Sequence, residues 1–245
     1  MGRKTDKKPS NEPFLGTTGL NIVTDNPESI VEVMSSITGD GLILLLTEES
    51  NLYHSQNAEK WKVSPKTLKW YDITPEEMRK FWGLMILMGQ VRKENIRDYW
   101  STVPTISIPI FPRTMSRDRF EPIWQAWYFS DNSQQTQDSG QLFKIWPTYE
   151  YSVQKFWSVY SPKQEPSLDE ATIPWRGRLK FRTYNPVKIT KYGVLVRMVC
   201  EAVSGYVCNM QIYSAEGKKL EEAVLSLLDR NLGQNHHIKT IFITV

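Results

Sequence analysis

The chain has 245 residues, of which 40% are hydrophobic, and a formal net charge of +3 at pH 7. This length suffices for one large or two smaller domains with a buried core, and the apolar content excludes an intrinsically disordered protein. The net charge is too small to indicate nucleic-acid binding by itself, so the distribution of charge along the chain matters more.

Neither a membrane span nor a secretion signal is predicted. The longest apolar runs, 41–46 and 81–88, are well short of the ~20 residues that cross a bilayer. The first residues lack the apolar core of a signal peptide, and their lysines and arginine are typical of a weak nuclear-import signal or of an ordinary tail. Cys200 and Cys208 lie in alternating apolar segments and are interpreted as buried thiols. We expect a nuclear, otherwise cytoplasmic, protein that is not secreted.

The first part of the chain divides into a tail and a helical region. Residues 1–27 are rich in polar residues, proline and glycine and are expected to form a disordered tail. Residues 28–160 show mainly helical signals. The clearest helix start is Thr74, a capping residue followed by proline at the first helical position and by two acidic residues. The helix that follows is apolar around most of its surface, which predicts a central place in a core.

Two further helices are predicted in this region. Ser116 is expected to cap a helix that continues through Phe129, with Pro122 perturbing it. The polar stretch 131–141 is interpreted as a linker or exposed loop, and a helix with aromatic residues at helical spacing follows Pro147. Aromatic residues in that pattern are more typical of a core than of base stacking.

After Pro166 the hydrophobic period changes from that of helices to that of strands. The order expected is strand, strand, strand, helix, strand, over the ranges 167–173, 194–200, 206–213, 218–231 and 240–245. A short hairpin connection at 201–205 should join the second and third strands. A right-handed crossover would then place the last strand parallel to the first.

The first of these strands carries Asp169 and Glu170, and a strongly basic loop follows it. The stretch 176–191 has no acidic residue and six basic ones: Arg176, Arg178, Lys180, Arg182, Lys188 and Lys191. A carboxylate that can hold a divalent metal beside cations that can contact phosphates is typical of enzymes that cut nucleic acids. The alternative is a solvated loop between strands. Because neighbouring strand residues point to opposite faces, Glu170 is not expected to share a metal with Asp169.

The residues that surround Asp169 resemble those of the piggyBac transposase family. The similarity is carried by Ser167-Leu168-Asp169-Glu170, Ile173-Pro174-Trp175-Arg176-Gly177-Arg178, Tyr184-Asn185-Pro186-Val187-Lys188 and Lys191-Tyr192-Gly193. Upstream, Phe81-Trp82-Gly83, the run 115–120 and Leu142-Phe143-Lys144-Ile145 are similar to the helical region of that family. The resemblance implies an α+β fold, with a mainly helical region over 28–160 and the first half of a ribonuclease-H-like mixed sheet over 161–245.

The resemblance also implies a chemistry. In that family three aspartates hold two divalent metals, Mg²⁺ in the ancestral enzymes, for cut-and-paste DNA transposition. Asp169 matches the first aspartate. The second is expected after His236-His237-Ile238, where this sequence has Lys239-Thr240-Ile241-Phe242 and no Asp or Glu after Asp229. We interpret the chain as a C-terminally truncated form with a divergent tail, Asp169 as a vestigial metal ligand, and both histidines as surface or loop residues.

The leading functional hypothesis is therefore a domesticated, catalytically inactive piggyBac-transposase-derived protein that needs no cofactor. It would retain binding to double-stranded DNA through the six basic residues, or association with related transposase-derived chains. One alternative is residual metal-dependent nuclease or transposase activity, with carboxylates supplied by a partner chain. Another is a truncated product without function, since an incomplete sheet leaves an exposed edge.

Overall fold

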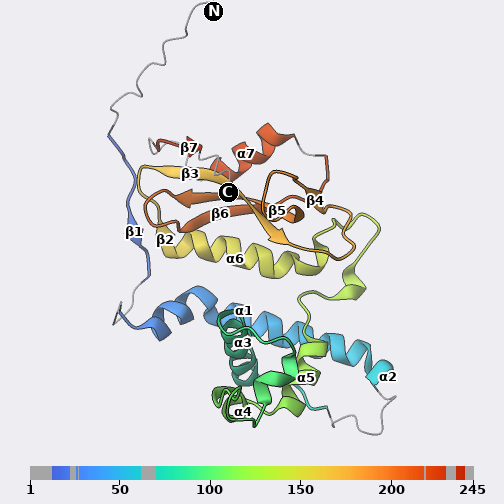
Figure 1. Ribbon diagram of the computed structural model, residues 1–245. Coiled ribbons are helices and arrows are strands. Elements are labelled where there is room, and N and C mark those ends of the chain that lie inside the picture. Colours follow the sequence, from blue (N-terminus) through green and yellow to red (C-terminus); the bar gives the residue numbers. More distant parts are fainter. Residues whose placement is uncertain are drawn as a thin grey trace, which may run out of the picture. The chain divides into compact units, whose positions relative to one another are not determined.

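The computed structural model describes residues 13–22, 26, 28–61, 70–217, 219–229 and 236–240. It divides the chain into two compact units (Figure 1), a helical unit of Glu28–Tyr151 and a sheet unit of Ser152–Val245 together with the described part of Met1–Pro27. The predicted α+β class, with helices first and a mixed sheet after them, is confirmed. The division between the units falls at 151/152, inside a helix, whereas the sequence suggested 160/161.

Among its described residues, the helical unit contains five α-helices and the start of a sixth. They are α1 (Ile30–Gln56), α2 (Ala58–Trp61), α3 (Pro75–Gln90), α4 (Ile110–Thr114), α5 (Arg117–Ala126) and the first residues of α6 (Trp146–Val159). Short 3-10 helices at Ile96–Trp100, Asn132–Gln134 and Phe143–Ile145 connect them. The second lies inside the polar stretch 131–141 that was predicted as a linker or exposed loop, and the third follows this stretch.

Helix α3 begins where the sequence predicts. The Thr74 hydroxyl accepts a hydrogen bond from the backbone N–H of Glu77 at 3.2 Å, and Pro75 occupies the first helical position. The Thr74 hydroxyl thus satisfies one N–H that the helix leaves unpaired at its start, and Pro75 has no N–H to satisfy. Met78, Phe81 and Leu84 of α3 are buried in the core of the unit, as the apolar surface of this segment indicated.

Helix α1 packs its second half into the same core. Gly39, with a φ of 66°, kinks the helix, and Leu42, Ile43 and Leu46 beyond the kink are buried. By length and composition alone α1 could cross a membrane, contrary to the expectation from apolar runs. Because these side chains pack in a protein core, the length and composition of α1 are weak evidence that it crosses a membrane.

Helix α5 differs in detail from its prediction. Ser116 occupies the N-cap position and its carbonyl accepts from the N–H of Phe120 at 2.9 Å, but its side chain makes no capping hydrogen bond. The helix contains Pro122 and ends at Ala126 instead of continuing through Phe129. Its end brings Trp127 edge-on to Phe81 of α3, so tertiary packing of the aromatic residues decides where the helix stops.

The sheet unit is built around β5 (Tyr192–Glu201). On one edge β5 pairs antiparallel with β3 (Pro166–Pro174), and on the other it pairs antiparallel with β4 (Thr183–Tyr184) and β6 (Val207–Ile212). The last strand, β7 (Lys239–Thr240), lies parallel to β3, as predicted from the crossover. Residues 241–245 of the predicted strand, and residues 218, 230 and 231 of the predicted helix, lie outside the described residues.

Helix α7 (Leu220–Leu228) supplies the crossover between β6 and β7 and packs on one face of the sheet. Leu227 and Leu228 of α7 form a buried cluster with Leu168 of β3 and Val199 of β5. The side-chain amide of Asn209 in β6 also donates to the carbonyl of Leu227 at 2.9 Å. In Figure 1, α7 lies beside the sheet strands at this end of the chain.

One short pairing involves the segment 1–27 that was expected to form a disordered tail. Gly19–Leu20 forms β1, which pairs antiparallel with β2 (Tyr160–Ser161) directly after α6. The N–H of Asn21 adds a hydrogen bond to the carbonyl of Val159 at 2.9 Å. The pairing joins residues about 140 positions apart, so local composition could not indicate it.

Candidate nucleic-acid interface

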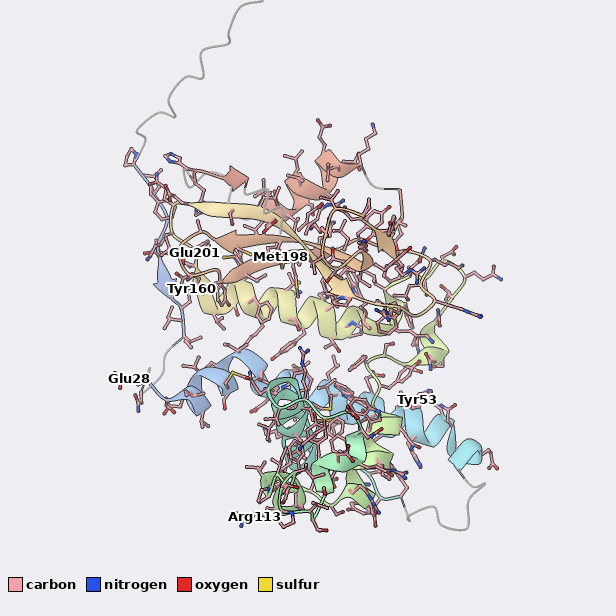
Figure 2. The ribbon with its side chains drawn as sticks, viewed as in Figure 1. Glu28, Tyr53, Arg113, Tyr160, Met198 and Glu201 are labelled. Atoms are coloured by element: carbon pink, nitrogen blue, oxygen red, sulfur yellow. The ribbon has the colours of Figure 1, made fainter. Side chains whose placement is uncertain are left out.

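Asp169 lies in the middle of β3, on the face of the sheet that points away from α7. The register places Asp169 opposite Met198 and Glu170 opposite Arg197, and paired residues share a face. Leu168, the neighbour of Asp169, packs against α7, so alternation along the strand turns Asp169 to the other face. Met198 marks this position on the sheet in Figure 2.

The neighbours of Asp169 on β3 and β5 are mainly apolar. Its nearest register neighbours on the same face are Ser167 and Ala171 on β3 and Val196, Met198 and Cys200 on β5. One carboxylate oxygen, Oδ1, accepts a hydrogen bond from the backbone N–H of Glu170 at 2.7 Å. Burial, and secondly the negative charge of Asp169, raises the pKa of the Cys200 thiol, so this thiol stays protonated at neutral pH.

These neighbours do not fit a two-metal centre. Such a centre needs several carboxylates that converge on the same two ions, and within the described part of the chain no three His, Cys, Asp or Glu side chains come together. The Glu170 carboxylate pairs instead with the Arg197 guanidinium at 3.2 Å. The register places the side chains of Glu170 and Asp169 on opposite faces of the sheet.

The basic loop, defined here as residues 175–191, connects β3 to β5 and includes β4. Its backbone closes on itself where the N–H of Asn185 donates to the carbonyl of Lys191 at 2.8 Å. The Asn185 side chain also accepts from the N–H of Val187 at 3.1 Å, a local turn that asparagine favours. The loop is therefore folded back on the sheet and carries its cations to one end of β3 and β5.

The structure separates the six predicted basic residues into two groups. Arg176, Arg178, Lys180 and Lys191 are exposed, and none forms an ion pair with any residue that the structure describes. The guanidinium of Arg182 donates to the carbonyls of Arg176 and Gly177, each at 3.4 Å. Unlike Arg182, the four exposed cations without ion-pair partners are available to contact phosphates.

Lys188 forms the second group with Arg182, because the side chains of both residues donate to backbone carbonyls. Its half-buried side chain donates from Nζ to the carbonyl of Glu170 at 2.9 Å, which ties the loop to β3. The DNA-contacting role of all six residues stays a prediction.

Three aromatic residues of this region received no role from the sequence. The side chains of Trp175, Tyr184 and Tyr192 are 47%, 56% and 49% exposed. Their types alone favoured burial, because aromatic residues are usually packed. Only the loop geometry shows that these rings face solvent among the cations.

A buried carboxylate was also missed. Glu201, at the end of β5, is 2% exposed and accepts hydrogen bonds from the Tyr160 hydroxyl at 2.7 Å, from the N–H of Lys163 at 3.1 Å and from the Ser204 hydroxyl. Figure 2 shows Glu201 and Tyr160 side by side. The glutamate looked like part of an exposed hairpin connection, and no sequence signal marked it as buried.

This arrangement determines how the two groups ionise. Burial opposes the charge on Glu201, but the hydrogen bonds from Ser204, Tyr160 and Lys163 outweigh it and hold the pKa of the carboxyl below its ordinary value. The same carboxylate, accepting from the phenol, raises the pKa of Tyr160 to about 12. The group is a fixed anion that ties β2, the 201–205 hairpin and β5 together, with a structural role.

Both cysteines were predicted to be buried, but Cys200 is only half-buried. Cys208 is buried, and burial raises the pKa of its thiol to about 12. His236 and His237 lie in a loop but are half-buried, since the ring of His236 packs 4.8 Å from that of Phe14. Burial lowers the pKa of His236.

The chain is similar to known proteins over most of its length. A family model described as transposase IS4 matches residues 31–240. The human PiggyBac transposable element-derived protein 3 is 23% identical over 186 residues, covering 76% of this chain and 29% of that protein. The human chimeric ERCC6-PGBD3 protein is also 23% identical over 186 residues, and these residues make up 16% of that protein. This chain thus spans less than a third of either human relative.

A solved structure is similar as well. A cryo-EM structure of the piggyBac transposase synaptic complex with hairpin DNA matches with a TM-score of 0.72 at 18% identity. The match covers 92% of this chain and 52% of that one. At this identity the likeness establishes the fold, and it agrees with the ribonuclease-H-like sheet that the resemblance implied.

Proposed function

Since this chain belongs to the transposase IS4 family, of the piggyBac type, we propose that it is a transposase-derived protein that binds DNA through its basic loop and does not cut DNA by itself. The observation that supports binding is the exposure of Arg176, Arg178, Lys180 and Lys191 on one loop without carboxylate partners among the described residues. Cations in this state can replace the counterions of a phosphate backbone. The loop offers no preformed hydrogen-bonding pattern for base edges, so the binding expected is independent of sequence.

The second part of the proposal follows from the surroundings of Asp169. The described neighbours of Asp169 on its face of β3 and β5 supply no further carboxylate. On the other edge of β3, where the second family aspartate is expected, β7 has Lys239 and Thr240. Cleavage would require carboxylates from outside the described residues, for example from a related chain. Association with such a chain is the alternative under which activity would return, and the solved relative is itself described as a synaptic complex.

Binding to duplex DNA is expected to be strong at low salt and to weaken steeply as salt rises. Replacing Arg176 and Arg178 by alanine together should reduce the slope of log K against log salt by about 1.8, because each phosphate contact contributes about 0.9. The measurement is a titration by gel shift or fluorescence anisotropy at several salt concentrations. Arg113→Ala, an exposed cation on α4, is the matched control and should leave the slope unchanged. Absence of duplex binding by the unaltered chain at low salt would contradict the proposal.

Supercoiled plasmid is expected to stay intact when it is incubated with the purified chain and Mg²⁺ or Mn²⁺. The measurement is conversion to the nicked circle on an agarose gel, with Asp169→Ala run alongside. Nicking that persists in Asp169→Ala would come from a contaminant, because this variant lacks the one family aspartate of the segment. Nicking by the unaltered chain that disappears in Asp169→Ala would show a functional metal site and overturn this part of the proposal.

A further inference from the structure

The basic loop exposes aromatic rings that contribute little to the core. Trp175, Tyr184 and Tyr192 are each about half exposed, and they lie within one short region of the sheet. In contrast, rings of the helical unit such as Phe81, Phe111 and Phe120 are fully buried. Neighbouring rings that face solvent are unusual on a protein surface and typically mark a binding site.

The sheet holds the three residues at adjacent positions. Tyr184 of β4 is the register partner of Tyr192 of β5, and their ring centroids are 4.6 Å apart with the planes inclined at 33°. On the other edge of β5 the N–H of Trp175, directly after β3, donates to the carbonyl of Tyr192 at 3.4 Å. Three neighbouring strand segments therefore bring one aromatic residue each to the same end of the sheet.

Two glycines permit this close arrangement. A Cβ on Gly177 would lie 2.6 Å from Nε1 of Trp175, so any side chain at this position would force the indole or the loop to move. A Cβ on Gly193 would lie 2.2 Å from the carbonyl oxygen of Ile173, so glycine is also required where β5 meets the end of β3. The backbone thus holds the loop against the edge of the indole.

The charges around the rings select the kind of molecule that would cover them. The guanidinium of Arg182 lies 5.2 Å from the ring centroid of Tyr192, and exposed cations flank the rings in sequence on both sides. With no acidic residue between 176 and 191, the surface fits a polyanion and disfavours a basic partner. Cations for phosphates together with aromatic faces for bases are the two components of single-strand binding sites.

We propose that Trp175, Tyr184 and Tyr192 form a stacking surface for unpaired nucleotides, so that the basic loop prefers single-stranded or unpaired DNA to a continuous duplex. This inference rests on the proposed DNA binding and specifies its substrate. A continuous duplex hides its base faces within the stack, and only unpaired bases can present them to a protein ring. The cations then act on every DNA, whereas the rings act only on unpaired bases.

The test is the affinity of the full chain for a labelled oligothymidine and for a blunt duplex of equal length, measured by fluorescence anisotropy in the same buffer. Tyr184→Ala and Trp175→Ala are each expected to weaken binding to the oligothymidine by roughly fivefold or more, the effect of losing one stacked base. Binding to the duplex should change by less than about twofold. Arg178→Ala, which removes a phosphate contact, should weaken both.

Controls separate stacking from loss of structure. Tyr184→Phe keeps the ring and should keep the affinity for oligothymidine. Circular dichroism identifies any variant that unfolds. If Trp175→Ala unfolds, Tyr184→Ala still provides the test, because Tyr184 is the most exposed of the three residues.

The outcomes also separate this inference from the proposal on which it rests. Duplex binding that equals or exceeds oligothymidine binding, with both unaffected by the ring variants, would overturn the stacking surface and leave the proposed DNA binding intact. That result would leave the rings available to a protein partner instead. Failure to bind either DNA at low salt would overturn both.

Discussion

Glu201→Gln is expected to destabilise the sheet unit by on the order of 3 kcal/mol, because an amide cannot replace the carboxylate that accepts three hydrogen bonds in a buried site. The amide N–H₂ would face one of the donors from Tyr160, Lys163 or Ser204 and leave it unsatisfied. The measurement is urea unfolding followed by circular dichroism. Glu222→Gln on α7, an exposed carboxylate of the same unit, is the control and should change stability by less than about 0.5 kcal/mol.

The same substitution should alter the dependence of stability on pH. The pKa of Glu201 is lower in the folded protein than in the unfolded chain. Its contribution to stability is therefore present above the ordinary carboxyl pKa of about 4.3 and is lost as pH falls through the lower folded value. Glu201→Gln should lack this part of the acid destabilisation. Equal stability of the variant and the unaltered chain at neutral pH would show that Glu201 does not tie the hairpin to β2.

Arg119→Ala is expected to destabilise the helical unit by about 3–5 kcal/mol, the cost of leaving one member of a buried ion pair uncompensated. The Arg119 guanidinium makes two hydrogen bonds of 2.6 Å to the Glu77 carboxylate, and its side chain is only 10% exposed. It also lies 3.6 Å from the ring centroid of Tyr71. Arg119→Lys should recover only part of the loss, because lysine cannot form the paired, stacked geometry.

The measurement is urea unfolding followed by tryptophan fluorescence, since most tryptophans lie in the helical unit. Arg117→Ala is the matched control on α5. Its exposed pair with Asp118 should contribute less than about 1 kcal/mol. In the double variant Glu77→Ala with Arg119→Ala, the loss should be smaller than the sum of the two single losses, because no charge is left unpaired. Additive losses would mean that the pair contributes no coupling energy.

Helix α3 and the order β3, β5, β6, α7, β7 could be predicted because their signals are local. A threonine before proline and acidic residues, such as Thr74, is a local signal for the start of a helix. Alternation of apolar residues likewise indicates a strand without knowledge of its partners. The crossover then required β7 to lie parallel to β3, as it does. The end of α5 and the pairing of β1 with β2 could not be predicted, because aromatic packing and a distant strand decide them.

The candidate site was predicted in composition and only partly in arrangement. The sequence located Asp169 and all six cations, and alternation alone indicated that Glu170 points away from Asp169. It did not distinguish the four cations without such contacts from Arg182 and Lys188, which hold the loop by donating to backbone carbonyls. That distinction depends on where the loop folds back, and this in turn depends on contacts with β3 and β5.

By itself, the sequence determined the family, the class of fold and the presence of one carboxylate beside a run of cations, because motif spacing and hydrophobic period are properties of the linear chain. Only the tertiary structure decided that Glu201 is a buried anion and that Trp175, Tyr184 and Tyr192 are exposed. The physical reason is that burial depends on which segments cover a residue. Strand register and loop closure decide which segments cover a residue, and both join residues that are far apart in the chain.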